Sequence, residues 1–253
     1  MSTLTARALA GLPEITSGMK LGQLIAGAAE AQGVALGSDE VVVVAQKAVS
    51  KAEGRVVALG EVSPGPRASE LAREHGHDAR AVQVVLDESV ELVRAERGVL
   101  ICRTRHGLVC ANAGVDASNA PAEEVLVLLP VDPDASARAL RGELRSLSGA
   151  APAVVITDSF GRAWRHGQCD VAIGIAGLSA LEDWRGRHDS AGRELRATWI
   201  AVADQLAGAA DLVRSKDSSE PVVIVSGLAA HVTAEDGPGA TALVRPLEED
   251  LFR

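Results

Sequence analysis

Hydrophobic residues recur at helical spacing in several parts of the chain. In the clearest case Leu21, Leu24 and Ile25 share one face, which predicts an amphipathic helix over residues 21–32. Asp134 is the expected N-cap of a later helix, because its carboxylate can accept a hydrogen bond from the first turn. The same spacing predicts helices over residues 68–74, 79–97, 134–146 and 197–213.

Short apolar runs alternate with these helical segments. The β-branched run at residues 41–44 predicts a fully buried strand. Similar runs predict strands over residues 99–103, 107–111, 124–129, 153–157 and 221–225. Hairpin-like strands mixed with helices favour an α+β fold with mixed, largely antiparallel sheets, packed helices and two intimately joined lobes. We expect residues 1–253 to form a single domain.

Composition narrows the possible partners. The formal net charge is −9 and only 2% of the residues are aromatic, whereas nucleic-acid binders usually carry a basic surface and rings for base stacking. We therefore expect no nucleic-acid partner. No apolar stretch reaches the roughly 18 residues of a membrane span, and the N-terminus does not resemble a signal peptide. Cys102, Cys110 and Cys169 lack CxxC spacing, which favours reduced thiols in the cytoplasm.

The densest polar segment after a predicted strand is Asn-Ala-Gly-Val-Asp-Ala-Ser-Asn at residues 112–119. The carboxylate of Asp116 is a suitable ligand for Mg²⁺ or Mn²⁺, and the amide of Asn119 can donate to a phosphate or a base. A capped turn, in which Asp116 and Asn119 bond to their own backbone, explains the same pattern. Spacing alone leaves both interpretations open.

A second candidate follows the predicted strand at residues 153–157. Asp158 and Ser159 come at its end and can supply further metal ligands, since active sites favour strand ends. The loop expected next carries Arg162 and Arg165, whose guanidinium groups can bind phosphate or carboxylate in a bidentate manner. An N-capping acid beside surface arginines is the alternative.

The third candidate, residues 46–55, follows the strand at residues 41–44. It contains Gln46, Lys47 and Lys51, and lysines at a strand exit can neutralise the phosphates of a nucleotide. The GxxxxGK[ST] pattern of a Walker A loop is absent, and from spacing alone a solvated turn with scattered charges is the better explanation. Neither paired metal-binding histidines nor a GxSxG nucleophile elbow occurs, which disfavours a zinc site and a serine hydrolase.

Taken in order, several long motifs resemble the coenzyme F420-0:L-glutamate ligase family, also called γ-glutamyl ligase. They cover almost the whole chain. The residues that carry the resemblance are GLPEI at 11–15, VSKAEGR at 49–55, NAGVDASN at 112–119, LLPVDPDASA at 128–137 and ITDSFGRAWRHGQ at 156–168. The chain also resembles the amino-terminal ligase half of the bifunctional actinobacterial form.

The resemblance implies ligands and partners that composition does not reveal. It implies GTP as co-substrate, Mg²⁺ or Mn²⁺ at two sites, a possible K⁺ requirement and a homodimer. Asp116 and Asp158 would bind one metal ion, and Ser159 would contribute to the other. Two residues depart from the family: Gln46 stands where relatives often have a serine that touches the nucleotide, and Lys216 stands where some relatives place an acidic metal ligand. The residues implied to contact GTP are Leu12, Pro13, Glu14, Ile15, Gln46, Lys51 and Asn119.

The implied reaction joins L-glutamate to coenzyme F420-0, with further γ-linked glutamates possible. It proceeds through an acyl phosphate and releases GDP and phosphate. Arg162, Arg165 and Lys51 are our candidates for stabilising the acyl phosphate or the leaving phosphate. Two alternatives stay open: a ligase of the same mechanism acting on another carboxylate acceptor, and a non-catalytic regulatory module that binds GTP and metal.

Overall fold

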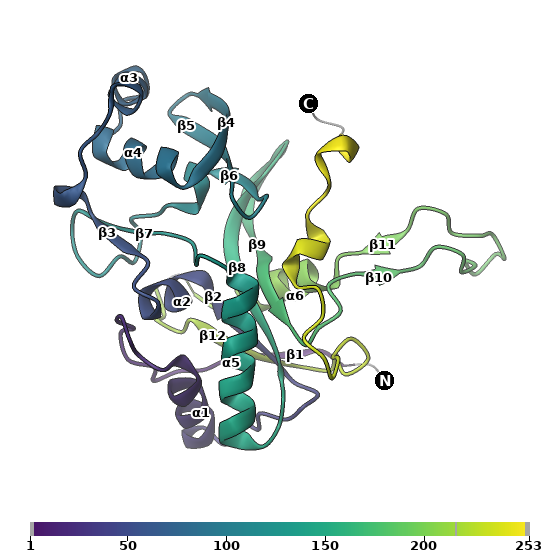
Figure 1. Cartoon of the computed structure of the whole chain (residues 1–253). Helices are drawn as coiled ribbons and strands as arrows, with labels where there is room; N and C mark the ends of the chain where they lie inside the picture. The colour runs from purple at the N-terminus through teal and green to yellow at the C-terminus, as the bar shows by residue number, and fades with distance from the viewer. Residues whose placement is uncertain (1–2, 216, 251–253) are drawn as a thin grey trace.

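The computed structural model describes residues 3–215 and 217–250 (Figure 1). Its centre is a five-stranded sheet in the order β1-β12-β2-β8-β9. Only β2 and β8 pair in parallel within this sheet, with Val41 opposite Ala153 and Ala45 opposite Thr157. The strands are β1 (Thr5–Ala8), β2 (Val41–Ala45), β8 (Ala153–Arg162), β9 (Arg165–Ala176) and β12 (Val222–Ser226).

Helices cover both faces of this sheet. Helices α1 (Leu21–Ala31), α2 (Gln46–Ala52) and α5 (Pro133–Ser148) pack on one face, where Val42 and Val44 point. Helix α6 (Val202–Asp211) covers the other face. All four valines of β2 are fully buried, because helices lie on both sides of the strand. The strands predicted at residues 41–44, 153–157 and 221–225 are thus confirmed.

A second group of elements encloses its own hydrophobic cluster beside the central sheet (Figure 1). Side chains such as Leu71, Val82 and Leu100 fill this cluster. The α+β class is confirmed, with mixed and antiparallel sheets. The elements of this group are β3 (Val56–Ala58), α3 (Pro66–His75), α4 (Ala79–Asp87), β4 (Ser89–Glu96), β5 (Val99–Thr104), β6 (Val109–Ala111) and β7 (Val125–Val127).

One predicted helix, over residues 79–97, is only half correct. Helix α4 ends at Asp87, and residues 89–96 form strand β4, which pairs with β5. Val90 and Val93 fit helical spacing, but both are substantially exposed on the strand. Their β-branched side chains favour the extended backbone that pairing with β5 stabilises.

Asp134 is not the N-cap of α5. Asp132 fills that position, and its side chain accepts a hydrogen bond from the backbone N–H of Ala135. Pro133 occupies the first helical position, where its missing N–H costs no bond. The carboxylate of Asp134 instead turns inward and accepts hydrogen bonds from the backbone N–H groups of Ile175 and Ala240, at 2.8 and 2.7 Å.

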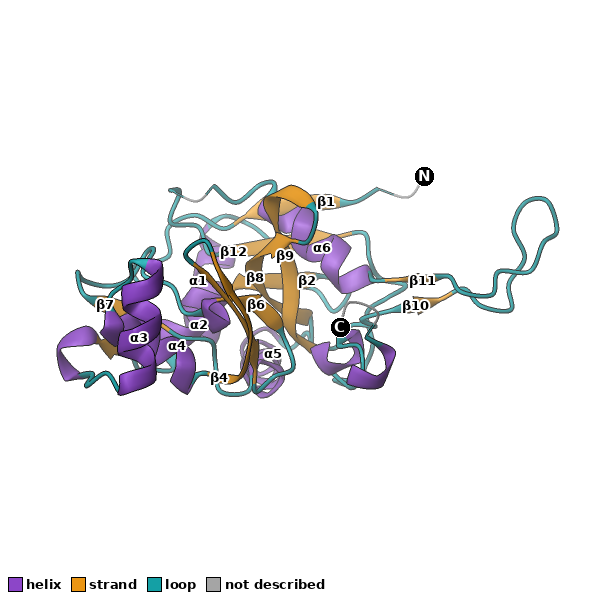
Figure 2. Ribbon diagram, turned by 90° about the horizontal axis from the view of Figure 1, so that it is seen from above, coloured by secondary structure: helices purple, strands orange, loops and turns teal. Residues whose placement is uncertain are grey.

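A long arm leaves the body of the molecule between β9 and α6. It includes β10 (Glu182–Asp183) and β11 (Trp199–Ile200), and it extends away from the sheets in both views (Figures 1 and 2). The helix predicted at residues 197–213 is therefore shorter than expected. Short 3-10 helices complete the fold at Leu59–Glu61, Asn112–Gly114, Ala240–Leu243 and Leu247–Glu249.

Across the described ranges, no helix combines the length and the apolar character that crossing a membrane requires. The three cysteines are free thiols. Cys102 and Cys110 are buried and stand opposite each other on β5 and β6. Burial raises the pKa of Cys110 to about 12, so this thiol stays protonated at neutral pH.

Candidate functional site

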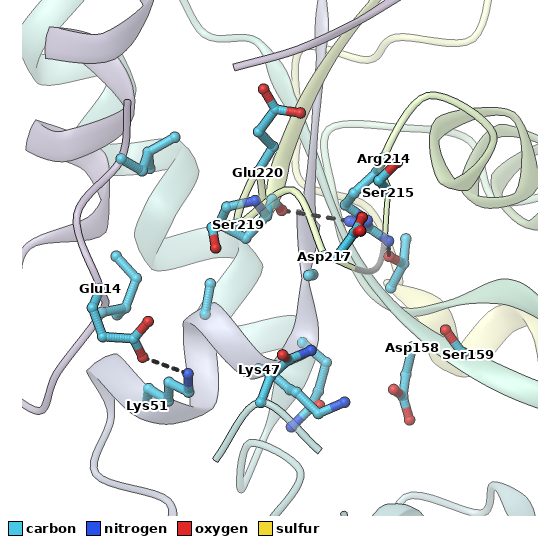
Figure 3. Close-up of a pocket in the computed structure, with 18 of the residues that line it drawn as sticks. Glu14, Lys47, Lys51, Asp158, Ser159, Arg214, Ser215, Asp217, Ser219 and Glu220 are labelled. Atoms are coloured by element: carbon cyan, nitrogen blue, oxygen red, sulfur yellow. Dashed lines mark hydrogen bonds and ion pairs between the residues drawn. The ribbon is translucent and has the colours of Figure 1, made fainter. Parts of the chain in front are cut away.

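A cavity of about 590 Å³ opens at the carboxyl end of β2, where the parallel pairing of β2 with β8 ends at Ala45 and Thr157. Ligands commonly bind there in α/β sheets, because loops that leave adjacent strands converge at that edge. Side chains from distant parts of the sequence form its wall (Figure 3). The lining includes Leu12, Pro13, Glu14, Ile15, Gln46, Lys47, Lys51, Asn119, Thr157, Asp158, Ser159, Asp170 and Arg214.

Most residues predicted for the site line this cavity. The set comprises Leu12, Pro13, Glu14, Ile15, Gln46, Lys51, Asn119, Asp158 and Ser159. Three others do not belong to the lining. Asp116 lies beside the cavity, where it pairs with Lys47, and Arg162 and Arg165 lie farther along the β8–β9 hairpin.

The N-terminal segment and α2 form one side of the cavity. Lys51 is almost completely buried, and its ammonium group donates a hydrogen bond to Glu14 at 2.6 Å (Figure 3). Gln46 is 2% exposed, and its amide nitrogen donates to Ser50 Oγ and to the Leu128 carbonyl, both at 2.7 Å. These bonds fix the direction of the Gln46 amide.

Asp158 lies on the opposite side, with Lys47 between it and the Glu14–Lys51 pair (Figure 3). Burial raises the pKa of Asp158 to about 6, and the negative charges of Asp170 and Asp116 act in the same direction. The positive charge of Lys47 and a hydrogen bond from the Ser159 backbone partly oppose this shift. A carboxylate in such surroundings gains from a nearby cation.

Asp116 ionises more readily. The ammonium group of Lys47 lies 2.6 Å from its Oδ2 atom, and both the hydroxyl and the backbone N–H of Ser118 donate to the carboxylate. Burial alone would raise the pKa of Asp116, but the hydrogen bonds from Lys47 and Ser118 lower it overall. The side chain of Asp116 thus caps its own turn and also contributes charge to the site.

Sequence reasoning missed two charged residues of the cavity wall, Asp170 and Arg214. Lys47 also lines the cavity, and it belongs to the predicted segment at residues 46–55, whose lysines were expected to neutralise the phosphates of a nucleotide. Asp170 is 1% exposed and accepts hydrogen bonds from Thr157 and Ser159, and Arg214 forms an ion pair with it. Only the pairing register of β8 and β9 reveals that Asp170 faces Ser159.

The loop expected after Ser159 is in fact a continuation of strand β8, which runs to Arg162. Arg165 begins β9, so both arginines lie at the turn of a β-hairpin. The guanidinium of Arg162 donates to the carbonyl of His166 across this turn. The two arginines are therefore placed outside the cavity lining.

The oxygen donors of the site fit a divalent cation. Within the described ranges, no three His, Cys, Asp or Glu side chains converge as a complete metal cage. Mg²⁺ does not need one, because one or two carboxylates, water and the phosphates of a nucleotide suffice. The poorly neutralised carboxylate of Asp158, with Asp116 and Ser159, matches that donor set. Lys216 lies outside the described residues.

Comparison with known proteins identifies the family. The F420-0:Gamma-glutamyl ligase family matches residues 11–227. A coenzyme F420:L-glutamate ligase from Methanopyrus kandleri is 45% identical, over 95% of this chain and 94% of that protein. Ligases of the same name from Methanothermobacter thermautotrophicus and Methanocaldococcus jannaschii are 41% and 43% identical, over 96% and 85% of this chain and 96% and 84% of their own length. The chain is a member of the F420-0:γ-glutamyl ligase family.

Proposed function

We propose that this protein is a GTP-dependent ligase that joins L-glutamate to coenzyme F420-0 through an amide bond. The observation that carries the proposal is the set of charged and polar side chains that line one cavity. Lys47 and Lys51 share a cavity of about 590 Å³ with the carboxylate of Asp158 and the hydroxyl of Ser159. Such a cavity suits a polyphosphate bound between cationic side chains and a metal ion.

Forming an amide from a carboxylate requires a better leaving group than hydroxide. The γ-phosphoryl group of GTP is transferred to the terminal carboxylate of the acceptor, which gives an acyl phosphate and GDP. The amine of L-glutamate then attacks the acyl carbon, and inorganic phosphate leaves with the former carboxylate oxygen. Positioning and charge neutralisation dominate the first step, because phosphoryl transfer needs little covalent participation by the protein.

Individual residues have distinct parts in this proposal. Leu12, Pro13, Glu14, Ile15, Gln46, Lys51 and Asn119 hold the nucleotide. Asp116 and Asp158 bind one Mg²⁺ or Mn²⁺ ion, and Ser159 contributes to a second. These ions supply positive charge to the phosphate oxygens. Lys47 and Arg214, which line the cavity, are better placed than Arg162 and Arg165 to neutralise the transferring group. Arg162 and Arg165, at the turn of the β8–β9 hairpin, then act on the acceptor.

A homodimer, a K⁺ requirement and a cytoplasmic location complete the proposal. They follow from the resemblance and from the reduced thiols rather than from the geometry of one chain. Light scattering of the purified protein tests the dimer directly. Replacing K⁺ by Na⁺ in the reaction buffer tests the monovalent cation.

A reconstitution assay tests the function. Purified protein is incubated with coenzyme F420-0, L-glutamate, GTP and Mn²⁺, each omitted in turn, and the products are weighed by mass spectrometry. A product heavier by one or more glutamyl units, formed only with GTP and Mn²⁺, is expected. Turnover of GTP with another carboxylate acceptor alone would identify a related ligase. Tight GTP binding without turnover on any acceptor would identify the regulatory module.

A further inference from the structure

The carboxylate of Asp170 lies at the wall of the cavity although its residue is only 1% exposed. It belongs to β9 and stands opposite Ser159 of β8 in the register of the hairpin. A buried charge of this kind is costly unless its oxygens are satisfied. The groups that donate hydrogen bonds to Asp170 therefore indicate its role.

Among residues 3–215 and 217–250, the side chains of Ser159, Thr157 and Arg214 donate to the two oxygens of Asp170. The hydroxyl of Ser159 donates to Oδ1 at 2.6 Å, and the hydroxyl of Thr157 donates to Oδ2 at 2.8 Å. The guanidinium of Arg214 also donates to Oδ2 and forms an ion pair with the carboxylate. Asp170 thus links the hydroxyls of Thr157 and Ser159 on β8 to Arg214, which lies three residues after the end of α6.

The bond to Ser159 has a chemical consequence. A serine hydroxyl has one proton to donate and two lone pairs to offer. Because the proton points to Asp170, Ser159 can present only lone pairs to the cavity that it lines. A hydroxyl held in this way is suited to coordinate a cation and cannot donate to a phosphate oxygen.

We propose that Asp170 is a positioning residue that orients the Ser159 hydroxyl as a ligand for a divalent cation. The inference rests on the proposed function, because it assigns Asp170 to the metal-binding part of that site. Arg214 has the complementary part. Its guanidinium contacts Asp170, Thr157 Oγ1 at 3.0 Å and the Pro221 carbonyl at 3.4 Å, and so ties both ends of residues 214–221 to the strand that carries Ser159.

Mn²⁺ binding to the full chain tests this role without relying on turnover. Calorimetry and electron paramagnetic resonance are measured with and without GDP for the wild type, Asp170→Asn, Ser159→Ala and the double variant. An amide can donate to Ser159 and so releases the serine proton toward the cavity. We expect Asp170→Asn to weaken Mn²⁺ binding by about 10- to 100-fold, the usual effect of losing a partner that orients a metal ligand.

Thr157→Val is the matched control, because it removes a donor to the same carboxylate but leaves the Ser159 bond intact. It should keep Mn²⁺ affinity near that of the wild type, and Asp170→Asn/Ser159→Ala should bind Mn²⁺ no more weakly than Ser159→Ala. Should Asp170→Asn fail to fold, Asp170→Asn/Arg214→Gln removes both buried charges together and is measured instead.

Wild-type Mn²⁺ affinity in a folded Asp170 variant would overturn the proposal, as would equal losses in Asp170→Asn and Thr157→Val. Absence of Mn²⁺ binding by the wild type would overturn it as well. A protein that shows the expected Mn²⁺ pattern but forms no glutamylated product would refute the proposed ligase while the role of Asp170 stands.

Discussion

The ammonium group of Lys47 lies 2.6 Å from Oδ2 of Asp116, and its charge also acts on Asp158. One lysine thus serves two carboxylates that the resemblance assigns to the same metal ion. A cation already present between them reduces the repulsion of two like charges at short range. The consequence is measurable, because each carboxylate should become harder to ionise when Lys47 is neutralised.

Lys47→Met should move the acid limb of the pH–activity profile of glutamylation to higher pH. Lys47 lowers the pKa of Asp116 and of Asp158, so its loss raises both. The proposed metal site needs the ionised forms, and they would then appear only at higher pH. The measurement is kcat/KM as a function of pH at saturating Mn²⁺. Lys51→Met, which removes a lysine paired with Glu14, should leave the acid limb in place; superimposable profiles for Lys47→Met and the wild type would contradict the prediction.

Asp158→Asn should abolish ligation and yet stabilise the fold at neutral pH. Because the pKa of Asp158 rises from 3.8 to about 6 on folding, the folded chain binds this proton more tightly than the unfolded chain. The resulting stabilisation is complete below about pH 4 and is lost as the pH rises through 6. Above pH 7 the variant should therefore exceed the wild type by roughly 1–3 kcal/mol in the free energy of unfolding.

Denaturant unfolding at pH 4 and pH 7.5, without metal, gives the comparison. The difference between variant and wild type should grow with pH. A difference that is the same at both pH values would mean that Asp158 does not titrate as described. Added Mn²⁺ should raise the melting temperature of the wild type at pH 7.5 and have much less effect on Asp158→Asn.

Asp134→Ala should cost about 2–5 kcal/mol of stability without altering the chemistry of the site. One carboxylate oxygen of Asp134 accepts from the buried N–H groups of Ile175 and Ala240, and each unsatisfied donor costs about 1–3 kcal/mol. Asp132→Ala removes only the N-cap of α5 and should cost about 1 kcal/mol. Urea unfolding of both variants makes the test; equal losses would show that the Asp134 bonds contribute nothing beyond a cap.

Lys51→Met should weaken GTP binding by about 10- to 100-fold, the equivalent of a lost charge-assisted hydrogen bond. Its ammonium group is nearly buried at the cavity wall, where little water can replace it. Arg165→Ala is the control, since Arg165 lies at the β8–β9 turn outside the lining, and its GTP affinity should match that of the wild type. Calorimetric titration with GTP would contradict the assignment if both variants lost affinity alike.

Sequence patterns predicted the parts of this fold that depend on local chemistry. The valine run of β2 has one interpretation in a domain of this size, and α1 shows a clear apolar face. The prediction of one helix over residues 79–97 was wrong because valines at helical spacing also suit a strand. Pairing with β5 decides between helix and strand for residues 89–96. The inward direction of the Asp134 side chain likewise depends on the backbone N–H groups of Ile175 and Ala240, which lie 41 and 106 residues away in sequence.

The residues of the site likewise include some that local sequence could predict and some that it could not. Asp158 and Ser159 could be chosen because they follow a recognisable strand, and both line the cavity. Asp170 could not, because its meaning comes from the register that places it opposite Ser159. Arg162 and Arg165 were expected in a loop, but continued pairing of β8 with β9 carries them to the hairpin turn.

The order of strands in the central sheet also bears on how the chain matures on the ribosome. Strand β2 lies between β12 and β8, and β1 pairs only with β12 within this sheet. Strand β2 therefore has an open edge, and β1 has no neighbour, until residues 222–226 have left the exit tunnel. Closing the sheet between such distant segments slows folding, because loop entropy must be lost before the contacts form. The apolar strand β2 is consequently covered along this edge only after β12 has been synthesised. Chaperone binding should therefore concentrate on chains stalled before Val222.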